Sequence, residues 1–272
     1  EKALASIKKA RNVRIEGTIL NNLGAIHYMQ NEVAKATDFW KMSADVLERN
    51  GDPRYGMALA NLARVLWRTG DWLGSRDARE RATTIGKTVG DREVESLAMT
   101  VAGDHALFVG SFDEAEAAYE RVAKLASASK SERDIMSSRL NLAKVHLATG
   151  KLEEAVRTLE EVLAWAEKEG GSWEEVPAAF LSLGKAKMTS GEVGSAAKLF
   201  KRATEILNPG DLRVKARLFR LLGVASAIKG DWYIATRYLE DSLRISETLS
   251  EIPECAVTGY DLAKIMEHFS LP

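Results

Sequence analysis

The chain has 272 residues, 46% of them hydrophobic, which is enough to build a sizeable core. Its 38 basic and 39 acidic residues give a formal net charge of −1, so no global field draws it onto nucleic acid or an anionic membrane. The single cysteine, Cys255, excludes an internal disulfide and favours a cytoplasmic setting. Charged residues interrupt every long apolar run, so neither a transmembrane helix nor a membrane partner is expected.

The predicted elements recur along the chain with a period near 40 residues. Glycine or asparagine recurs at steps of 39 to 41 residues. Both residue types tolerate the left-handed backbone conformation in which many helices end. These predicted turn residues are Asn31, Gly70, Gly110, Gly150, Gly191 and Gly230. Such a period is typical of stacked repeats. We predict that one helix precedes each of these turn residues and that a second helix follows it.

Six complete repeats are predicted within a single array over residues 1–272. They span residues 14–52, 53–90, 91–130, 131–171, 172–210 and 211–251. The run 1–13 is expected to be the second helix of a partial repeat, so the chain is expected to be a segment of a longer protein. Residues 253–269 are expected to form one capping helix. No segment alternates as a strand does, so essentially no strand is predicted.

Small residues mark the places where the two helices of a repeat approach each other. Seven residues before the turn stand Gly24, Ala63, Gly103, Ala143, Gly184 and Gly223. Five residues after it stand Ala36, Ser75, Ala115, Ala155, Ala196 and Ala235. Nine residues after it come the expected core fillers: Trp40, Arg79, Tyr119, Leu159, Phe200 and Leu239. Arg79 is the one exception among these fillers. Trp72 and Trp232, two residues after their turns, are expected in the core as well.

This pattern resembles the tetratricopeptide repeat. The residues that carry the resemblance are Leu183-Gly184, Ala196, Phe200 and Ala203, with Asn208-Pro209 closing the copy, together with their equivalents over roughly residues 14 to 250. The period is longer than the usual ~34 residues. The aromatic residue usual early in the first helix is mostly missing, because Met99 and Arg139 occupy that position in two copies.

The resemblance implies an all-α, right-handed α-solenoid of antiparallel helix hairpins, a tetratricopeptide-like superhelix. Long-period arrays of this kind resemble those of spindle-orientation adaptors, kinesin light chains and the sensor domains of signal-transduction ATPases. The family implies binding of peptides, proteins or small inducers, and it does not imply catalysis.

No catalytic or metal-binding signature stands out. Gly86-Lys87-Thr88 is similar to the end of a phosphate loop, but the earlier glycine would fall at Arg81 and no strand precedes it. The four histidines lie far apart in the sequence and lack metal-ligand spacing. His27 and His146 share one repeat position, where a packing role is favoured over a ligand role. The sequence therefore predicts no enzyme, no metal and no cofactor.

In a stack of hairpins, the first helices are expected to line the concave surface. The charged residues that point inward by phase are Arg64, Arg68, Asp104, Lys144, Lys185, Arg217 and Arg220. This set is mostly basic in a chain whose total charges nearly cancel. A positive groove for an anionic partner, such as an acidic or phosphorylated peptide, is one interpretation. The alternative is ordinary solvated charge without a partner.

Asparagines and aromatic residues also point inward by phase. In this family, an asparagine nine residues before the turn often hydrogen-bonds an extended peptide, and that position holds Asn22, Asn61 and Asn141. The alternative is that these amides are merely solvated. Trp67, Tyr28 and Phe108 are either binding anchors in the groove or packing residues against the next first helix.

The sequence thus predicts a protein- or peptide-recognition scaffold within a larger signalling or regulatory protein. The second interpretation is a small-molecule sensor that controls an attached effector, for which a deep closed pocket would be the evidence. Self-association through the ends of the array is a further expectation, whereas direct contact with nucleic acid is not expected.

Overall fold

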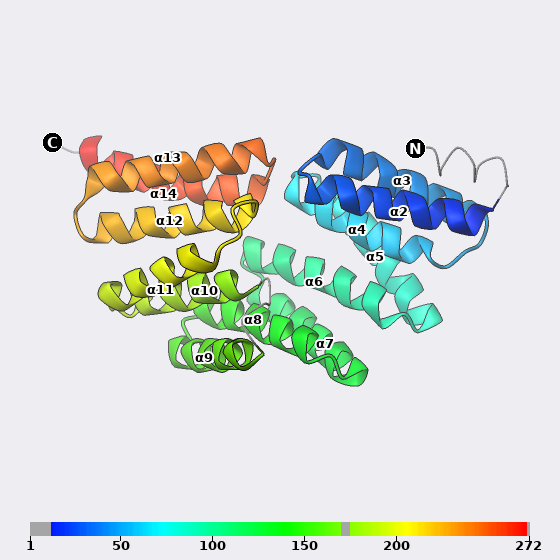
Figure 1. The fold of residues 1–272 in the computed structure, drawn as a ribbon, viewed down its shortest axis with the longest axis horizontal. Coiled ribbons are helices and arrows are strands. Elements are labelled where there is room, and N and C mark those ends of the chain that lie inside the picture. Colours follow the sequence, from blue (N-terminus) through cyan, green and yellow to red (C-terminus); the bar gives the residue numbers. More distant parts are fainter. Residues whose placement is uncertain (1–11, 170–174, 271–272) are drawn as a thin grey trace. The chain divides into compact units, whose positions relative to one another are not determined.

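The computed structural model describes residues 12–169 and 175–270, and every regular element in these ranges is an α-helix (Figure 1). The all-α prediction is therefore confirmed for the described part of the chain. The predicted partial helix at 1–13 falls almost wholly outside it. No helix within the described ranges combines the length and the apolar composition that a bilayer span requires.

The helices group into two compact units, residues 1–129 and residues 130–272. The boundary coincides with the junction of the predicted third and fourth repeats. The first unit contains three hairpins: α2 (Val13–Met29) with α3 (Val33–Arg49), α4 (Tyr55–Arg68) with α5 (Trp72–Val89), and α6 (Arg92–Val109) with α7 (Phe112–Ser129). Within it, α3 packs against α4 and α5 packs against α6, so the hairpins stack in chain order.

The second unit contains three hairpins and a single last helix. Its elements are α8 (Glu132–Ala148) with α9 (Leu152–Lys168), α10 (Val176–Thr189) with α11 (Val193–Ile206), α12 (Leu212–Ile228) with α13 (Trp232–Thr248), and then α14 (Ile252–Ser270). α14 packs against both α12 and α13, which is the position expected of a capping helix. Each predicted full repeat thus holds one pair of helices.

The turn residues have the backbone conformation that the sequence predicts. The five loop glycines have φ between 79° and 83°, and Asn31 has φ of 60°. An L-residue with a Cβ rarely adopts this region, whereas glycine and asparagine tolerate it. Side chains cap two of the helices, since Ser131 accepts from the Asp134 amide at 3.3 Å and Asp211 accepts from the Val214 amide at 3.2 Å.

The two helices of a hairpin touch through a match of residue size. A Cβ added at Gly24 would lie 2.6 Å from the indole of Trp40, and one added at Gly103 would lie 2.5 Å from the ring of Tyr119. The same holds for Gly184, where a Cβ would lie 2.3 Å from Phe200. These three aromatic rings are fully buried. An aromatic filler therefore faces a glycine, because the ring occupies the volume of the missing Cβ.

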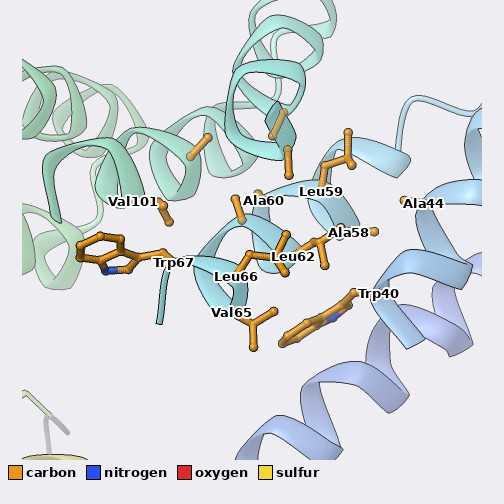
Figure 2. Close-up of a cluster of buried hydrophobic side chains, with 14 of the residues drawn as sticks. Trp40, Ala44, Ala58, Leu59, Ala60, Leu62, Val65, Leu66, Trp67 and Val101 are labelled. Carbon is orange, nitrogen blue, oxygen red and sulfur yellow. The ribbon is translucent and has the colours of Figure 1, made fainter. Parts of the chain in front are cut away.

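The core of the first unit shows how these fillers are enclosed. In Figure 2, Trp40 from α3 points into the same cluster as Leu62, Val65 and Leu66 from α4. Trp67, at the end of α4, belongs to this cluster as well. A single hairpin cannot bury both of its faces, and this cluster shows how successive hairpins bury them together.

Two of the expected core fillers differ from the prediction. Trp72 is 43% exposed, so its assignment to the core was wrong. It is the first residue of α5, at the turn end of the α4–α5 hairpin, where Phe108 of α6 covers only part of the indole. Trp232 occupies the equivalent position on α13 and is half-buried, with its ring stacked on His268 at 4.1 Å.

We expect Gly184→Ala to destabilise the second unit by about 1–3 kcal/mol, because the new methyl group would overlap the ring of Phe200. Adding Phe200→Leu should recover part of this loss, since the double variant recreates the Ala143–Leu159 pairing of the fourth repeat. Chemical denaturation of the single and double variants measures both effects.

The matched control is Gly259→Ala in α14, where an added Cβ would meet no atom within 4 Å. This variant should be neutral or more stable by up to about 1 kcal/mol, because glycine disfavours a helix interior. A Gly184→Ala variant as stable as the parent would contradict the size-match argument.

Candidate functional site

Several of the predicted site residues of the first unit lie together on α2 and α4. The Asn61 amide donates to the Asn21 side-chain oxygen at 3.2 Å, and the Arg64 guanidinium donates to the Asn61 oxygen at 3.1 Å. Amide and guanidinium groups from two successive first helices thus form one hydrogen-bonded chain. We name Asn21, Tyr28, Asn61, Arg64 and Arg68 the α2–α4 cluster.

Tyr28 forms the second half of this cluster. The guanidinium carbons of Arg64 and Arg68 lie 5.2 and 5.4 Å from the centre of its ring, within the range of cation–π attraction. Arg68 also donates a hydrogen bond to the Tyr28 hydroxyl. Both guanidiniums are half-buried on α4 and are held by an aromatic ring, which orients them before any partner arrives.

The α2–α4 cluster contains Asn21, which the repeat spacing did not predict, and it does not contain Asn22, which the spacing did predict. Asn22 is exposed on α2, whereas its neighbour Asn21 makes the contact to Asn61. A signal for this was present, because Asn21 and Asn61 are 40 residues apart, as are Tyr28 and Arg68. Equivalent contacts between successive first helices therefore follow the repeat length itself.

Trp67 lies in the core of the first unit. Only 6% of it is exposed, and its ring contacts His105 at 5.4 Å and Phe108 at 5.3 Å on α6. Packing against the next first helix was the alternative considered for these aromatic residues. Its burial leaves Trp67 little surface for a partner.

In the second unit, Asn141 and Lys144 lie on α8 as a local pair. The Lys144 ammonium donates to the Asn141 oxygen at 2.8 Å, and both side chains are half-buried. The spacing of three residues places them on one face of the helix.

Lys185, Arg217 and Arg220 form a separate group that involves α14. Arg220 donates to Glu254 at 2.7 Å and to Asp261 at 3.2 Å, while Arg217 lies 3.5 Å from Glu254. Only 15% of the Arg220 side chain and 14% of the Glu254 side chain are exposed. These residues form a buried ion-pair network that attaches α14 to α12.

The environment of this network shifts the pKa of its members. Burial alone would raise the pKa of Glu254, but Arg220 and Arg217 outweigh it and hold that pKa below its usual value. Lys185 is exposed on α10, yet desolvation by its surroundings, followed by repulsion from Arg220, lowers its pKa.

The network corrects the charge count made from the sequence. That count ended at the sixth repeat and found one acidic residue among the inward charges. α14 places Glu254 and Asp261 against Arg217 and Arg220, so the last part of the array supplies its own anions. The capping helix follows the last turn residue, which is why counting from the turns missed it.

The described residues lack the arrangements that metal binding or thiol catalysis requires. No group of three or more His, Cys, Asp or Glu side chains in the described ranges could hold a metal ion. Burial, together with Glu247, Glu254 and Glu251, raises the pKa of the Cys255 thiol, which disfavours the nucleophilic thiolate. His27 contacts Glu32 at 2.5 Å and stacks on Phe39 at 5.1 Å, consistent with a packing role.

Comparison with known families adds to this geometry. Two family models described as "Tetratricopeptide repeat" match residues 134–208 and 56–81. The chain is an array of tetratricopeptide-like repeats. A search of curated protein sequences finds no significant match to this array.

Solved structures resemble the repeat array over nearly its whole length. A Rap protein complexed with Competence and Sporulation Factor shares 17% identity at a TM-score of 0.65, covering 98% of this chain and 80% of that one. The Rap conjugation gene regulator of the plasmid pLS20, in complex with the Phr* peptide, shares 15% identity at a TM-score of 0.67, covering 96% and 77%. At such identities the likeness shows the fold alone.

A third neighbour is a signal-transduction ATPase with a tetratricopeptide repeat sensor from Pyrococcus horikoshii. It shares 17% identity at a TM-score of 0.60, and the match covers 97% of this chain but 41% of that one. The repeat array thus corresponds to part of a longer protein in this comparison.

We expect Glu254→Gln to loosen α14, because it removes the closest anion from the buried Arg220 guanidinium. The loss should be about 3 kcal/mol, near the lower end for a broken buried pair, since Asp261 remains. Hydrogen exchange of the α14 amides measures it. Because the pKa of Glu254 is lowered in the folded protein, its contribution is complete at neutral pH. That contribution should be lost as the pH falls below the ordinary value of 4.5.

Glu267→Gln on the exposed side of α14 is the control and should leave the exchange unchanged. Equal protection of α14 in the parent and in Glu254→Gln would mean that the network does not hold this helix.

Proposed function

We propose that the chain is a non-catalytic scaffold that binds a peptide or protein segment along its first helices. The observation that supports this most is the α2–α4 cluster, where the half-buried guanidiniums of Arg64 and Arg68 both lie close to the ring of Tyr28. A guanidinium offers a planar pair of donors to a carboxylate, whereas the Asn61 amide is 8% exposed, already bonds Asn21 and Arg64, and serves to position Arg64.

The partner that this chemistry fits is anionic, such as an acidic or phosphorylated peptide. In the first unit, Arg64 and Arg68 would contact the charged groups of such a partner. In the second unit, Asn141, Lys144 and Lys185 are candidates for a separate contact of the same kind. Arg217 and Arg220 are committed to Glu254 and Asp261, so we assign them to the attachment of α14. Two of the structural neighbours, the Rap proteins, were solved with a bound factor or peptide, which agrees with this proposal.

The second candidate is a small-molecule sensor, for which the ATPase neighbour with a repeat sensor is the support. Two hollows in the second unit, of about 350 and 480 Å³, are open to solvent and lined largely by polar and charged side chains. The described residues that line them include no Phe, Tyr or Trp. A sensor pocket is normally concave and mostly apolar. These hollows therefore favour the scaffold over the sensor.

Charge reversal tests the scaffold. We expect Arg64→Glu and Lys144→Glu each to weaken the binding of fluorescein-labelled acidic and phosphoserine decapeptides by about tenfold, since each replaces an attraction by a repulsion. Fluorescence polarisation at two salt concentrations measures the affinity, and added salt should weaken binding by the parent protein.

The control is Glu120→Lys on the exposed surface of α7, which changes the net charge by the same amount in the opposite direction. If Glu120→Lys alters the affinity as much as Arg64→Glu does, the effect is one of total charge, and the anionic groove is excluded.

A further inference from the structure

Arg79 occupies a position that every other repeat fills with a large apolar residue. The five equivalents, Trp40, Tyr119, Leu159, Phe200 and Leu239, are all 0% exposed. The Arg79 side chain is itself only 18% exposed. A guanidinium held this deeply is unfavourable unless a carboxylate or another anion compensates for its lost hydration.

Two other arginines of similar burial have close anions of their own. Arg220, 15% exposed, is hydrogen-bonded to two carboxylates, and Arg213, 22% exposed, donates to Glu251 at 2.8 Å. Arg79 instead reaches Glu80 at 3.8 Å, and the Glu80 side chain is 66% exposed. A distance of 3.8 Å is beyond a hydrogen bond, so this pair is a weak, solvated one.

Other charged groups around Arg79 change this balance little. Glu114 of α7 attracts it and Arg76 repels it, both electrostatically. Desolvation is the largest influence, and it lowers the pKa of Arg79 below its usual value. Arg79 is therefore a partly desolvated cation whose Glu80 ion pair, at 3.8 Å, is too long for a hydrogen bond.

Arg79 belongs to a strip of side chains between α5 and α6. Trp72, Arg76 and Arg79 follow one another on α5 at helical spacing, so they share one face. On α6, Phe108 lies 6.0 Å from the Trp72 ring, and desolvation, followed by Arg79, lowers the pKa of His105. We name Trp72, Arg76, Arg79, His105 and Phe108 the α5–α6 seam.

The open end of this seam is apolar and accessible. Trp72 is 43% exposed, and the residues next to Trp72 and Phe108 are still more so, with Leu73 at 74% and Val109 at 53%. Large exposed apolar side chains that gather at one place are typical of an interaction surface. Basic groups behind an apolar rim indicate a partner that is both apolar and acidic.

We propose that the α5–α6 seam is a second binding site of this protein, separate from the α2–α4 cluster. It takes a peptide or protein segment in which a carboxylate stands beside an apolar side chain. The carboxylate pairs with Arg79, with Arg76 at the rim, and the apolar side chain packs on Trp72. A free inorganic anion would satisfy Arg79 but would leave the apolar rim uncovered, so the seam fits a segment of chain better.

The same geometry predicts an opposition between stability and binding. Replacing Arg79 with leucine restores the apolar filler of the other repeats and removes a buried cation. The variant should therefore be more stable and yet bind less well, which is typical of a residue retained for function. If Arg79 served packing alone, the Arg79→Leu variant would be less stable than the parent protein.

The test uses the whole chain and three fluorescein-labelled octapeptides. The first peptide has two leucines flanked by glutamates, the second has the leucines flanked by lysines, and the third has serines flanked by glutamates. Fluorescence polarisation should show saturable binding of the first peptide. The other two peptides should bind with an affinity lower by about tenfold or more. Arg79→Leu should weaken the first peptide about tenfold while raising the melting temperature by about 2–4 °C.

Two further variants make the result specific to the seam. Trp72→Ala should also weaken the leucine–glutamate peptide, whereas Arg64→Glu in the α2–α4 cluster should weaken the serine–glutamate peptide more than the leucine–glutamate peptide. If Arg64→Glu weakens this peptide and Arg79→Leu does not, the peptide occupies the α2–α4 cluster, which overturns the seam but leaves the proposed scaffold intact. No saturable binding, or an Arg79→Leu variant that is less stable and still binds, overturns the seam as well.

Discussion

The close approach of the two helices in each hairpin is the constraint on which the rest of this structure depends. Glycine on the first helix accepts an aromatic ring from the second, as Gly103 accepts Tyr119 and Gly184 accepts Phe200. Where the filler is the smaller Leu159, alanine suffices on the facing helix. In every described hairpin except the second, where Arg79 replaces the filler, this match buries the inner face. The remaining faces of the first helices are then left for stacking and for polar contacts.

Repetition transmits chemistry as well as packing. Contacts between successive first helices recur at about one repeat length, from Asn21 to Asn61 in the first unit and from Arg220 to Asp261 in the second. The same geometry therefore has two outcomes. In the first unit the contact joins two amides, whereas in the second unit a carboxylate on α14 closes it into an ion pair that holds this helix.

The departures from the repeat pattern are as informative as the pattern. Arg79 replaces an apolar filler, and its burial, weakly compensated within the described residues, is a local cost that the rest of the second repeat must offset. Trp72 begins α5 with much of its indole in solvent. A protein selected for stability alone would have leucine at 79, as the fourth and sixth repeats do at the equivalent position. The two departures lie on one face of α5.

The sequence by itself determined the all-α class, the helix pairs, the left-handed turns and the small-against-large packing, because steric rules act at fixed spacings along the chain. It also placed Asn61, Arg64 and Arg68 on one side of a first helix, where the structure brings Arg64 against Asn61 and both arginines against Tyr28. Only the tertiary structure decided which inward residues meet: Asn21 in place of Asn22, Trp67 in the core, and Arg220 taken by α14. These outcomes depend on the helix that packs alongside, and a period counted along one chain does not specify what a neighbouring helix presents.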